Sequence, residues 1–85
     1  MDHVALLGQL VAIDSVNPDL VAGASGEREI AGLVACWLDG RGLQVVAEDA
    51  APGRPNVIGI VRGRGNGHSL MINAHTDTVG TGAML

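Results

Sequence analysis

The chain has 85 residues, and a domain of this size buries only about 60% of the surface that its unfolded chain exposes, so we expect a thin core. The formal net charge is −4, and the five basic residues are all arginine, which gives no general basic face for the phosphate backbone of nucleic acid. Trp37 is the only aromatic residue, which also disfavours stacking of bases. We therefore expect no nucleic-acid partner.

Cysteine usage and hydropathy bear on the compartment. The single cysteine, Cys36, excludes an internal disulfide and is typical of a reducing compartment; without a second cysteine or a nearby histidine, we interpret it as structural. The start, Met1-Asp2-His3, lacks the basic segment of a secretory signal, and the longest apolar runs are far short of a membrane span. We expect a soluble, cytoplasmic protein with no membrane partner.

A first helix is predicted from Asp2, which can cap it, to about Asp14. Its apolar residues recur at helical spacing, which indicates that one face packs against another element. These residues are Val4, Leu6, Leu7, Leu10, Val11 and Ile13. The following segment, from Ser15 to Ser25, contains Asn17-Pro18 and is predicted to be a loop, because the residue before a proline is pushed out of helical geometry.

A second helix is predicted to start at Ser25 or Gly26 and to stop at Gly40 and Gly42. Its apolar stripe is the strongest helix signal in the chain. The stripe consists of Ile30, Leu33, Val34, Trp37 and Leu38, with Trp37 as the expected core anchor. Glu27 and Glu29 fall in the first turn, where the helix dipole favours negative charge, and we interpret them as capping residues rather than metal ligands.

Three strands are predicted in the second half. The first runs from Leu43 to Asp49, a turn at Pro52-Gly53 follows, and the second runs from Asn56 to Arg62. Ser69 to Ala74 is predicted as a third strand, which Asn66-Gly67 would join to the second by a tight antiparallel hairpin. The glycine-rich residues 63–67 look superficially like a phosphate-binding loop, but such a loop leads into a helix.

The predicted fold is therefore α/β, in the order helix, helix, strand, strand, strand. Leu70-Met71-Ile72 is a continuous apolar run, as expected of a central strand that is covered on both faces. Three strands alone would leave an outer backbone edge exposed and prone to aggregation. We therefore expect residues 1–85 to be the amino-terminal part of a larger domain.

The functional signal lies where that apolar run ends, at His75 and Asp77. Side chains alternate along an extended chain, so these two would lie on the same side if strand geometry persists. A histidine that binds a metal through one ring nitrogen usually donates its other N–H to a carboxylate or a carbonyl. Asp77 could be that partner or itself a ligand, although a His-x-Asp triplet also occurs by chance in many proteins.

The context of this triplet resembles a known family, the one that contains acetylornithine deacetylase, succinyl-diaminopimelate desuccinylase, aminoacylase and carboxypeptidase G. The resemblance to the first metal-binding motif of that family runs over Leu70-Met71-Ile72-Asn73-Ala74-His75-Thr76-Asp77-Thr78-Val79. Three upstream segments are also placed as in that family: Ser15-Val16-Asn17-Pro18, Gly26-Glu27 and Pro55-Asn56-Val57-Ile58-Gly59. The resemblance covers nearly all of the chain.

The resemblance implies the opening part of a zinc-aminopeptidase-like catalytic domain, with His75 as a metal ligand and Asp77 as the catalytic-site carboxylate that orients it. It implies two Zn²⁺ ions, with Co²⁺ or Mn²⁺ as alternatives, and hydrolysis of an amide bond in an N-acyl amino acid or short peptide, as in a deacetylase or metallopeptidase. A complete enzyme of this family can be a homodimer with a lid domain.

The other metal ligands and the catalytic glutamate of that family find no match in this chain. We therefore expect residues 1–85 alone to be inactive as a hydrolase. The alternative is a noncatalytic remnant or an interaction module that binds no metal.

Overall fold

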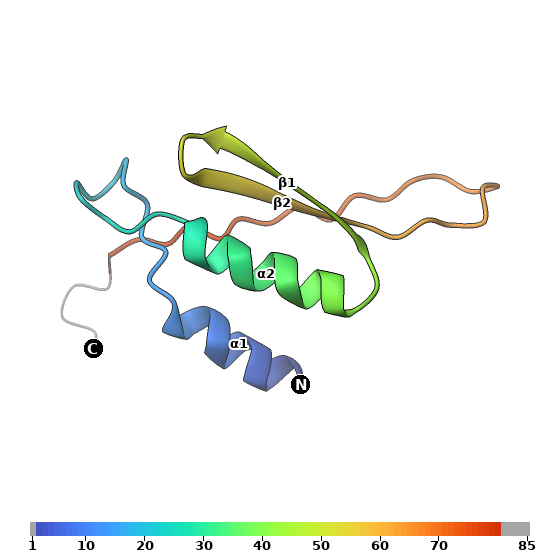
Figure 1. Ribbon diagram of the computed structural model, residues 1–85, viewed down its shortest axis with the longest axis horizontal. Helices are drawn as coiled ribbons and strands as arrows, with labels where there is room; N and C mark the ends of the chain where they lie inside the picture. The colour runs from blue at the N-terminus through green and yellow to red at the C-terminus, as the bar shows by residue number, and fades with distance from the viewer. Residues whose placement is uncertain (1, 81–85) are drawn as a thin grey trace.

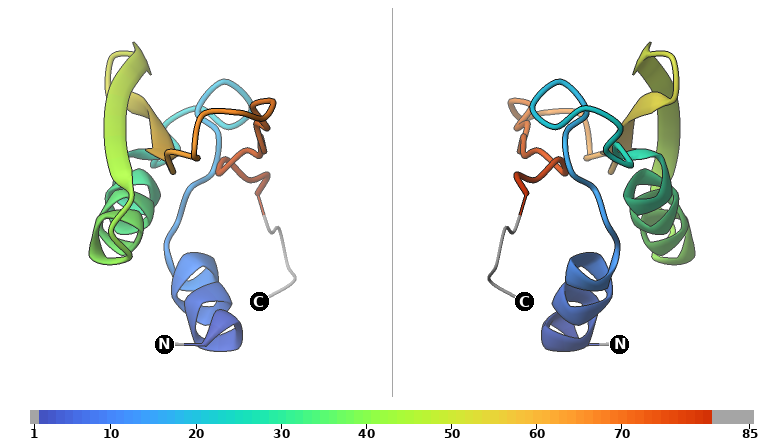
Figure 2. Two further views of the ribbon diagram at one scale, coloured as in Figure 1. Left: turned by 90° about the vertical axis from the view of Figure 1, so that its right-hand side faces the viewer. Right: turned by 90° about the vertical axis from the view of Figure 1, so that its left-hand side faces the viewer.

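The computed structural model describes residues 2–80, which form two helices and one two-stranded antiparallel sheet. The helices are α1 (His3–Ala12) and α2 (Arg28–Gly40), and the strands are β1 (Gln44–Ala51) and β2 (Arg54–Ile60). The β1–β2 hairpin packs on α2, while α1 lies apart from both (Figures 1 and 2). The expected mixture of helix and strand is confirmed. Neither helix is long and apolar enough to cross a membrane.

Helix α1 begins as predicted but does not pack as predicted. The side chain of Asp2 caps it, because Asp2 Oδ1 accepts a hydrogen bond of 2.8 Å from the N–H of Ala5. The helix ends at Ala12, earlier than expected, and none of its residues is buried. Its apolar face, with Val4, Leu7 and Val11, is exposed, since no other element of residues 2–80 lies against it. The predicted packing is therefore wrong for the described residues.

Helix α2 supplies the small core together with β2. Ile30 and Ala31 are buried. Near the other end of the helix, a Cβ added to Gly59 would lie only 3.0 Å from terminal side-chain carbons of Leu38 and Leu43, so a larger residue here would require these leucines to shift. The helix stripe predicted from the sequence is thus the face that packs on the hairpin.

Trp37 is half-buried in α2 rather than a fully buried core anchor. The guanidinium carbon of Arg41 lies 4.6 Å from the centroid of its ring, a cation–π arrangement. Its indole Nε1 is buried without a hydrogen-bond partner among residues 2–80. The small hairpin cannot enclose an aromatic side chain of this size from all sides.

The β1–β2 hairpin uses the predicted turn. Ala51 pairs with Arg54 across Pro52-Gly53, and Gly53 has a φ of 72°, which this residue adopts at no steric cost. Both strands lie near their predicted positions. The antiparallel pair is nevertheless formed by the first two predicted strands and not by the last two.

The third strand and its hairpin are not formed in the structure. A type I′ turn at Asn66-Gly67 requires positive φ at both residues, whereas the positive φ in this segment, 101°, belongs to Gly65. The chain after β2 still reverses direction (Figure 1), but the returning residues 69–74 do not pair with β2. Leu70, Met71 and Ile72 are 87%, 85% and 89% exposed, and residues 69–74 pair with no strand of the described chain. This part of the predicted fold is wrong, because an apolar run becomes a strand only when another strand pairs with it.

Candidate metal-binding site

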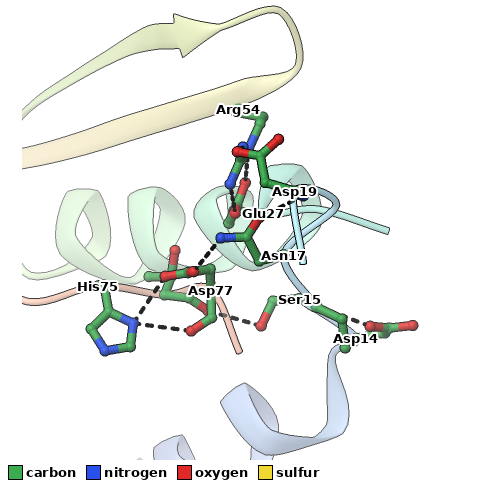
Figure 3. A network of polar contacts seen from close by, with 10 residues as sticks. Asp14, Ser15, Asn17, Asp19, Glu27, Arg54, His75 and Asp77 are labelled. Carbon is green, nitrogen blue, oxygen red and sulfur yellow. Dashed lines mark hydrogen bonds and ion pairs between the residues drawn. The ribbon is translucent and has the colours of Figure 1, made fainter. Parts of the chain in front are cut away.

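Two segments that lie far apart in the sequence meet beside the hairpin, and we call residues 15–17 and 76–78 together the clasp. Val16 and Thr78 form an isolated parallel bridge. The N–H of Asn17 donates to the carbonyl of Thr78 at 2.9 Å, and the N–H of Thr78 donates to the carbonyl of Ser15 at 3.0 Å. The clasp fixes the backbone on which the predicted site residue Asp77 stands (Figure 3).

Ser15 is the most buried side chain of the clasp, with 1% of its surface exposed. Its Oγ donates a hydrogen bond of 2.8 Å to the carbonyl of Thr76. The buried hydroxyl of Ser15 is thereby satisfied, as is usual for buried polar groups. Thr76 separates His75 from Asp77, so this bond holds the middle of the His-x-Asp triplet.

The structure brings the two predicted site residues together. His75 Nδ1 lies 3.0 Å from Asp77 Oδ1 and 3.0 Å from the main-chain oxygen of Asp77. Both oxygens are acceptors, so Nδ1 must carry the proton, and in the neutral ring the lone pair is then on Nε2. The His75 side chain is 85% exposed. Figure 3 shows its second ring nitrogen pointing away from the clasp.

Asn17 holds the other side of the Asp77 carboxylate. Its Nδ2 donates a hydrogen bond of 2.8 Å to Asp77 Oδ2, while its Oδ1 accepts one of 2.8 Å from the N–H of Asp19. The hydrogen bond from Asn17 is the main cause that lowers the pKa of Asp77; burial opposes it, and His75 lowers the pKa further. Asp77 is therefore ionised at neutral pH and can accept both hydrogen bonds. Because one oxygen faces His75 and the other Asn17, the geometry favours an orienting role over that of a ligand.

An ion cluster lies next to the clasp and links it to α2 and β2 (Figure 3). Arg54 donates to both carboxylate oxygens of Glu27, at 2.9 and 2.6 Å, and to Asp19 at 2.8 Å. Glu27 is only 6% exposed, and its hydrogen bond with Arg54 is the main cause that lowers its pKa. Glu27 occupies the N-cap position of α2, yet its side chain makes no capping hydrogen bond. The predicted capping role is therefore wrong for Glu27, whereas Glu29 lies in the first turn as predicted.

The reactive side chains outside the clasp do not join it. His3, His68 and Cys36 are exposed, and none of them takes part in the hydrogen-bond network around Asp77. Within residues 2–80, no group of three or more His, Cys, Asp or Glu side chains is placed to hold a metal ion. The described residues therefore offer the predicted zinc one ligand atom, His75 Nε2, and not a complete coordination shell.

The resemblance includes the segment Ser15-Val16-Asn17-Pro18, but sequence reasoning assigned no individual role to Ser15, Asn17 or Arg54. A Ser-x-Asn-Pro segment predicts an extended loop, because the residue before proline avoids helical geometry. Nothing local indicates which distant residues that loop pairs with: Asn17 and Asp77 are 60 positions apart.

Comparison of the chain with protein-family models, with curated proteins and with solved structures gave no match.

Proposed function

We propose that this chain contributes the first ligand motif of a metal-dependent amidohydrolase, with His75 as a metal ligand and Asp77 as the carboxylate that orients it. The observation that supports this most is the state of the imidazole: Nδ1 faces two oxygens of Asp77, and the largely exposed ring presents Nε2 outward. Histidine ligands in metal sites are usually held in this way. The sequence resemblance described above supports the same assignment.

A bound Zn²⁺, or Co²⁺ or Mn²⁺ in its place, lowers the pKa of a water molecule and polarises a carbonyl oxygen. The substrate class that goes with this chemistry is the amide of an N-acyl amino acid or short peptide. Asp77 keeps the proton on Nδ1 of His75, so that Nε2 is available to the metal. Because a zinc site needs three or four ligands, the others come from outside residues 2–80. A zinc-aminopeptidase-like domain and a cytoplasmic location belong to the same proposal.

A second candidate function is an interaction module without metal. Exposed apolar side chains favour it, since Leu70, Met71 and Ile72 stand almost fully in solvent and the apolar face of α1 is uncovered. This surface fits binding to another protein segment. The two candidates are separated by whether His75 binds metal more tightly than an ordinary surface histidine.

The test is a titration of the chain with ZnCl₂, followed by NMR of the three histidine rings. His3 and His68 are internal controls, since both are exposed and lie outside the clasp. We expect the ring signals of His75 to respond at a Zn²⁺ concentration about tenfold or more below that needed for the other two, because an oriented ligand binds more tightly. In His75→Ala, neither of the two remaining histidine rings should respond at this low Zn²⁺ concentration. In His68→Ala, the His75 ring should respond as in the wild-type chain. A His75 ring that responds no earlier than His3 and His68 would contradict the metal assignment and leave the interaction module.

A further inference from the structure

We propose that Asn17 is a positioning residue, which fixes the tautomer and direction of the neutral His75 ring by holding the carboxylate of Asp77; its use in metal binding rests on the proposed function. Two successive hydrogen bonds connect Asn17 with the ring. Asn17 Nδ2 donates to Asp77 Oδ2 at 2.8 Å, and Asp77 Oδ1 lies 3.0 Å from His75 Nδ1. Asn17 itself does not touch the imidazole.

The reason that Asp77 needs such a partner lies in its side-chain torsion. The carboxylate of an aspartate turns easily about its last bond, because rotation about an sp³–sp² bond has broad minima. A carboxylate held only by His75 would turn together with the exposed ring. The bond to Asn17 pins the second oxygen, so the first stays in line with Nδ1. Neutral imidazole can carry its proton on either nitrogen, and a fixed acceptor beside Nδ1 selects Nδ1–H.

Asn17 is itself held by two further hydrogen bonds, so it can impose an orientation. Its side-chain oxygen accepts from the N–H of Asp19, and its own N–H donates to the carbonyl of Thr78. The side chain of Asp19 is in turn paired with Arg54. The amide group thus has one orientation, with its NH₂ toward Asp77 (Figure 3). Ser15 does not hold the carboxylate of Asp77, because its hydroxyl donates a hydrogen bond to the carbonyl of Thr76 instead.

The first experiment reads the ring nitrogens of His75 directly. The ¹⁵N chemical shifts of the metal-free, ¹⁵N-labelled chain are measured at alkaline pH, where the rings are neutral, and they tell Nδ1–H from Nε2–H. We expect mainly Nδ1–H at His75 in the wild-type chain. In Asn17→Ala and Asn17→Asp, His75 should change to the mixture that His3 and His68 show in the same sample. Asn17→Asp keeps an acceptor for Asp19 but has no donor for Asp77.

Two comparisons separate positioning from a general loss of structure. Asn66→Ala, at an exposed asparagine outside the clasp, should leave the His75 ring unchanged. Ser15→Ala removes one hydrogen bond of the clasp but keeps the donor that faces the carboxylate, so we expect a smaller change in the His75 ring than in Asn17→Ala. A ring that changes as much in Ser15→Ala as in Asn17→Ala would show that Asn17 acts only by holding the backbone, which overturns the inference. A wild-type ring that is mainly Nε2–H, or one that Asn17→Ala leaves unchanged, overturns it too.

A second measurement keeps this inference distinct from the proposed function. In the ZnCl₂ titration, Asn17→Ala should raise the Zn²⁺ concentration at which His75 responds by about tenfold, the low end of the range for residues that orient a ligand. If Asn17→Ala changes which ring nitrogen of His75 carries the proton, but His75 of the wild-type chain binds no zinc, the positioning role stands and the proposed function fails. If zinc binds at His75 and Asn17→Ala changes neither readout, the proposed function stands and the positioning role fails.

Discussion

Asp77 is the residue at which the clasp and the imidazole meet. Its two carboxylate oxygens are divided between His75 and Asn17, and its main-chain oxygen also lies 3.0 Å from His75 Nδ1. Removing the carboxylate leaves Nδ1 of His75 with only the main-chain oxygen of residue 77 as a partner. The ring then loses most of what orients it, although Nε2, the proposed ligand atom, remains.

We therefore predict that Asp77→Ala weakens zinc binding at His75 by about 10–100-fold without abolishing it, the usual effect of losing a group that orients a ligand. The measurement is the ZnCl₂ titration read at the His75 ring. Asp49→Ala, at an exposed position of β1, is the matched control for the loss of one negative charge. An equal dissociation constant in Asp77→Ala and the wild-type chain would make Asp77 a bystander.

The proximity of His75 and Asp77 was predictable, because it depends on a spacing of two residues along an extended chain. It survives even though residues 69–74 form no strand, since the clasp keeps residues 76–78 extended. The role of Asn17 was not predictable. It depends on a contact across 60 positions, and no periodicity or turn motif encodes such a contact.

Among the elements, α2 and β2 are joined by the ion pair between Glu27 and Arg54. The positive charge of Arg54 offsets the cost of burying the Glu27 carboxylate. Glu27 is buried, and its charge would be costly without the two hydrogen bonds from the guanidinium. Because Arg54 also binds Asp19, the same side chain fixes the loop that carries Asn17. The pair therefore supports both the core and the clasp.

This pair gives the stability a defined pH dependence. The hydrogen bond from Arg54 lowers the pKa of Glu27 below its ordinary value of 4.5, so the stabilisation is present above that value and is lost as the pH falls through the lowered pKa. We expect the free energy of unfolding to fall steadily below about pH 4.5 for this reason. Glu27→Gln should lose that part of the pH dependence and cost about 1–2 kcal/mol at neutral pH.

Urea unfolding at pH 6 and at pH 3, followed by the fluorescence of the only tryptophan, measures both effects. Glu48→Gln is the control, since Glu48 is exposed on β1 and lies outside the ion cluster. A difference between pH 6 and pH 3 that is the same in Glu27→Gln and in the wild-type chain would show that the pair does not govern acid stability.

The elements that the sequence predicted are those with local causes. Asp2 caps α1, the apolar stripe of α2 faces the hairpin, and Pro52-Gly53 makes the turn, each because of residues a few positions apart. The third strand failed because its local signal, an apolar run, says nothing about a pairing partner. The role of Glu27 was missed for the same reason, because its partner Arg54 is 27 positions away.

For the molecule as a whole, the main feature is the apolar surface that residues 2–80 leave open. A wide groove with a volume of about 1790 Å³ lies between the α2–β2 layer and residues 71–79. Beside it, residues 70–72 expose both apolar side chains and an unpaired backbone, and the outer edge of β2 is unpaired as well. Such surfaces pair readily with other chains.

We predict that the chain self-associates and that Ile72→Lys raises the concentration for half-association roughly 10- to 100-fold, because burying one isoleucine contributes about 1.5–3 kcal/mol. Sedimentation velocity over a range of protein concentrations measures this. Ser69→Lys is the matched control, since it adds the same charge at an exposed polar position of the same segment. A wild-type chain that stays monomeric, or an equal effect of Ser69→Lys, would contradict a role for the apolar side chain.

The clasp also has a consequence for the order in which the molecule folds. The bond from Ser15 to Thr76 spans 61 positions, whereas α2 and the hairpin are built from neighbours along the chain. Closing so long a loop costs entropy, so we expect α2 and the hairpin to form first and the clasp last. The clasp would then also open first, with the rest still folded. Anything that binds only the closed clasp, whether a metal ion or a covering chain, would hold it shut by mass action.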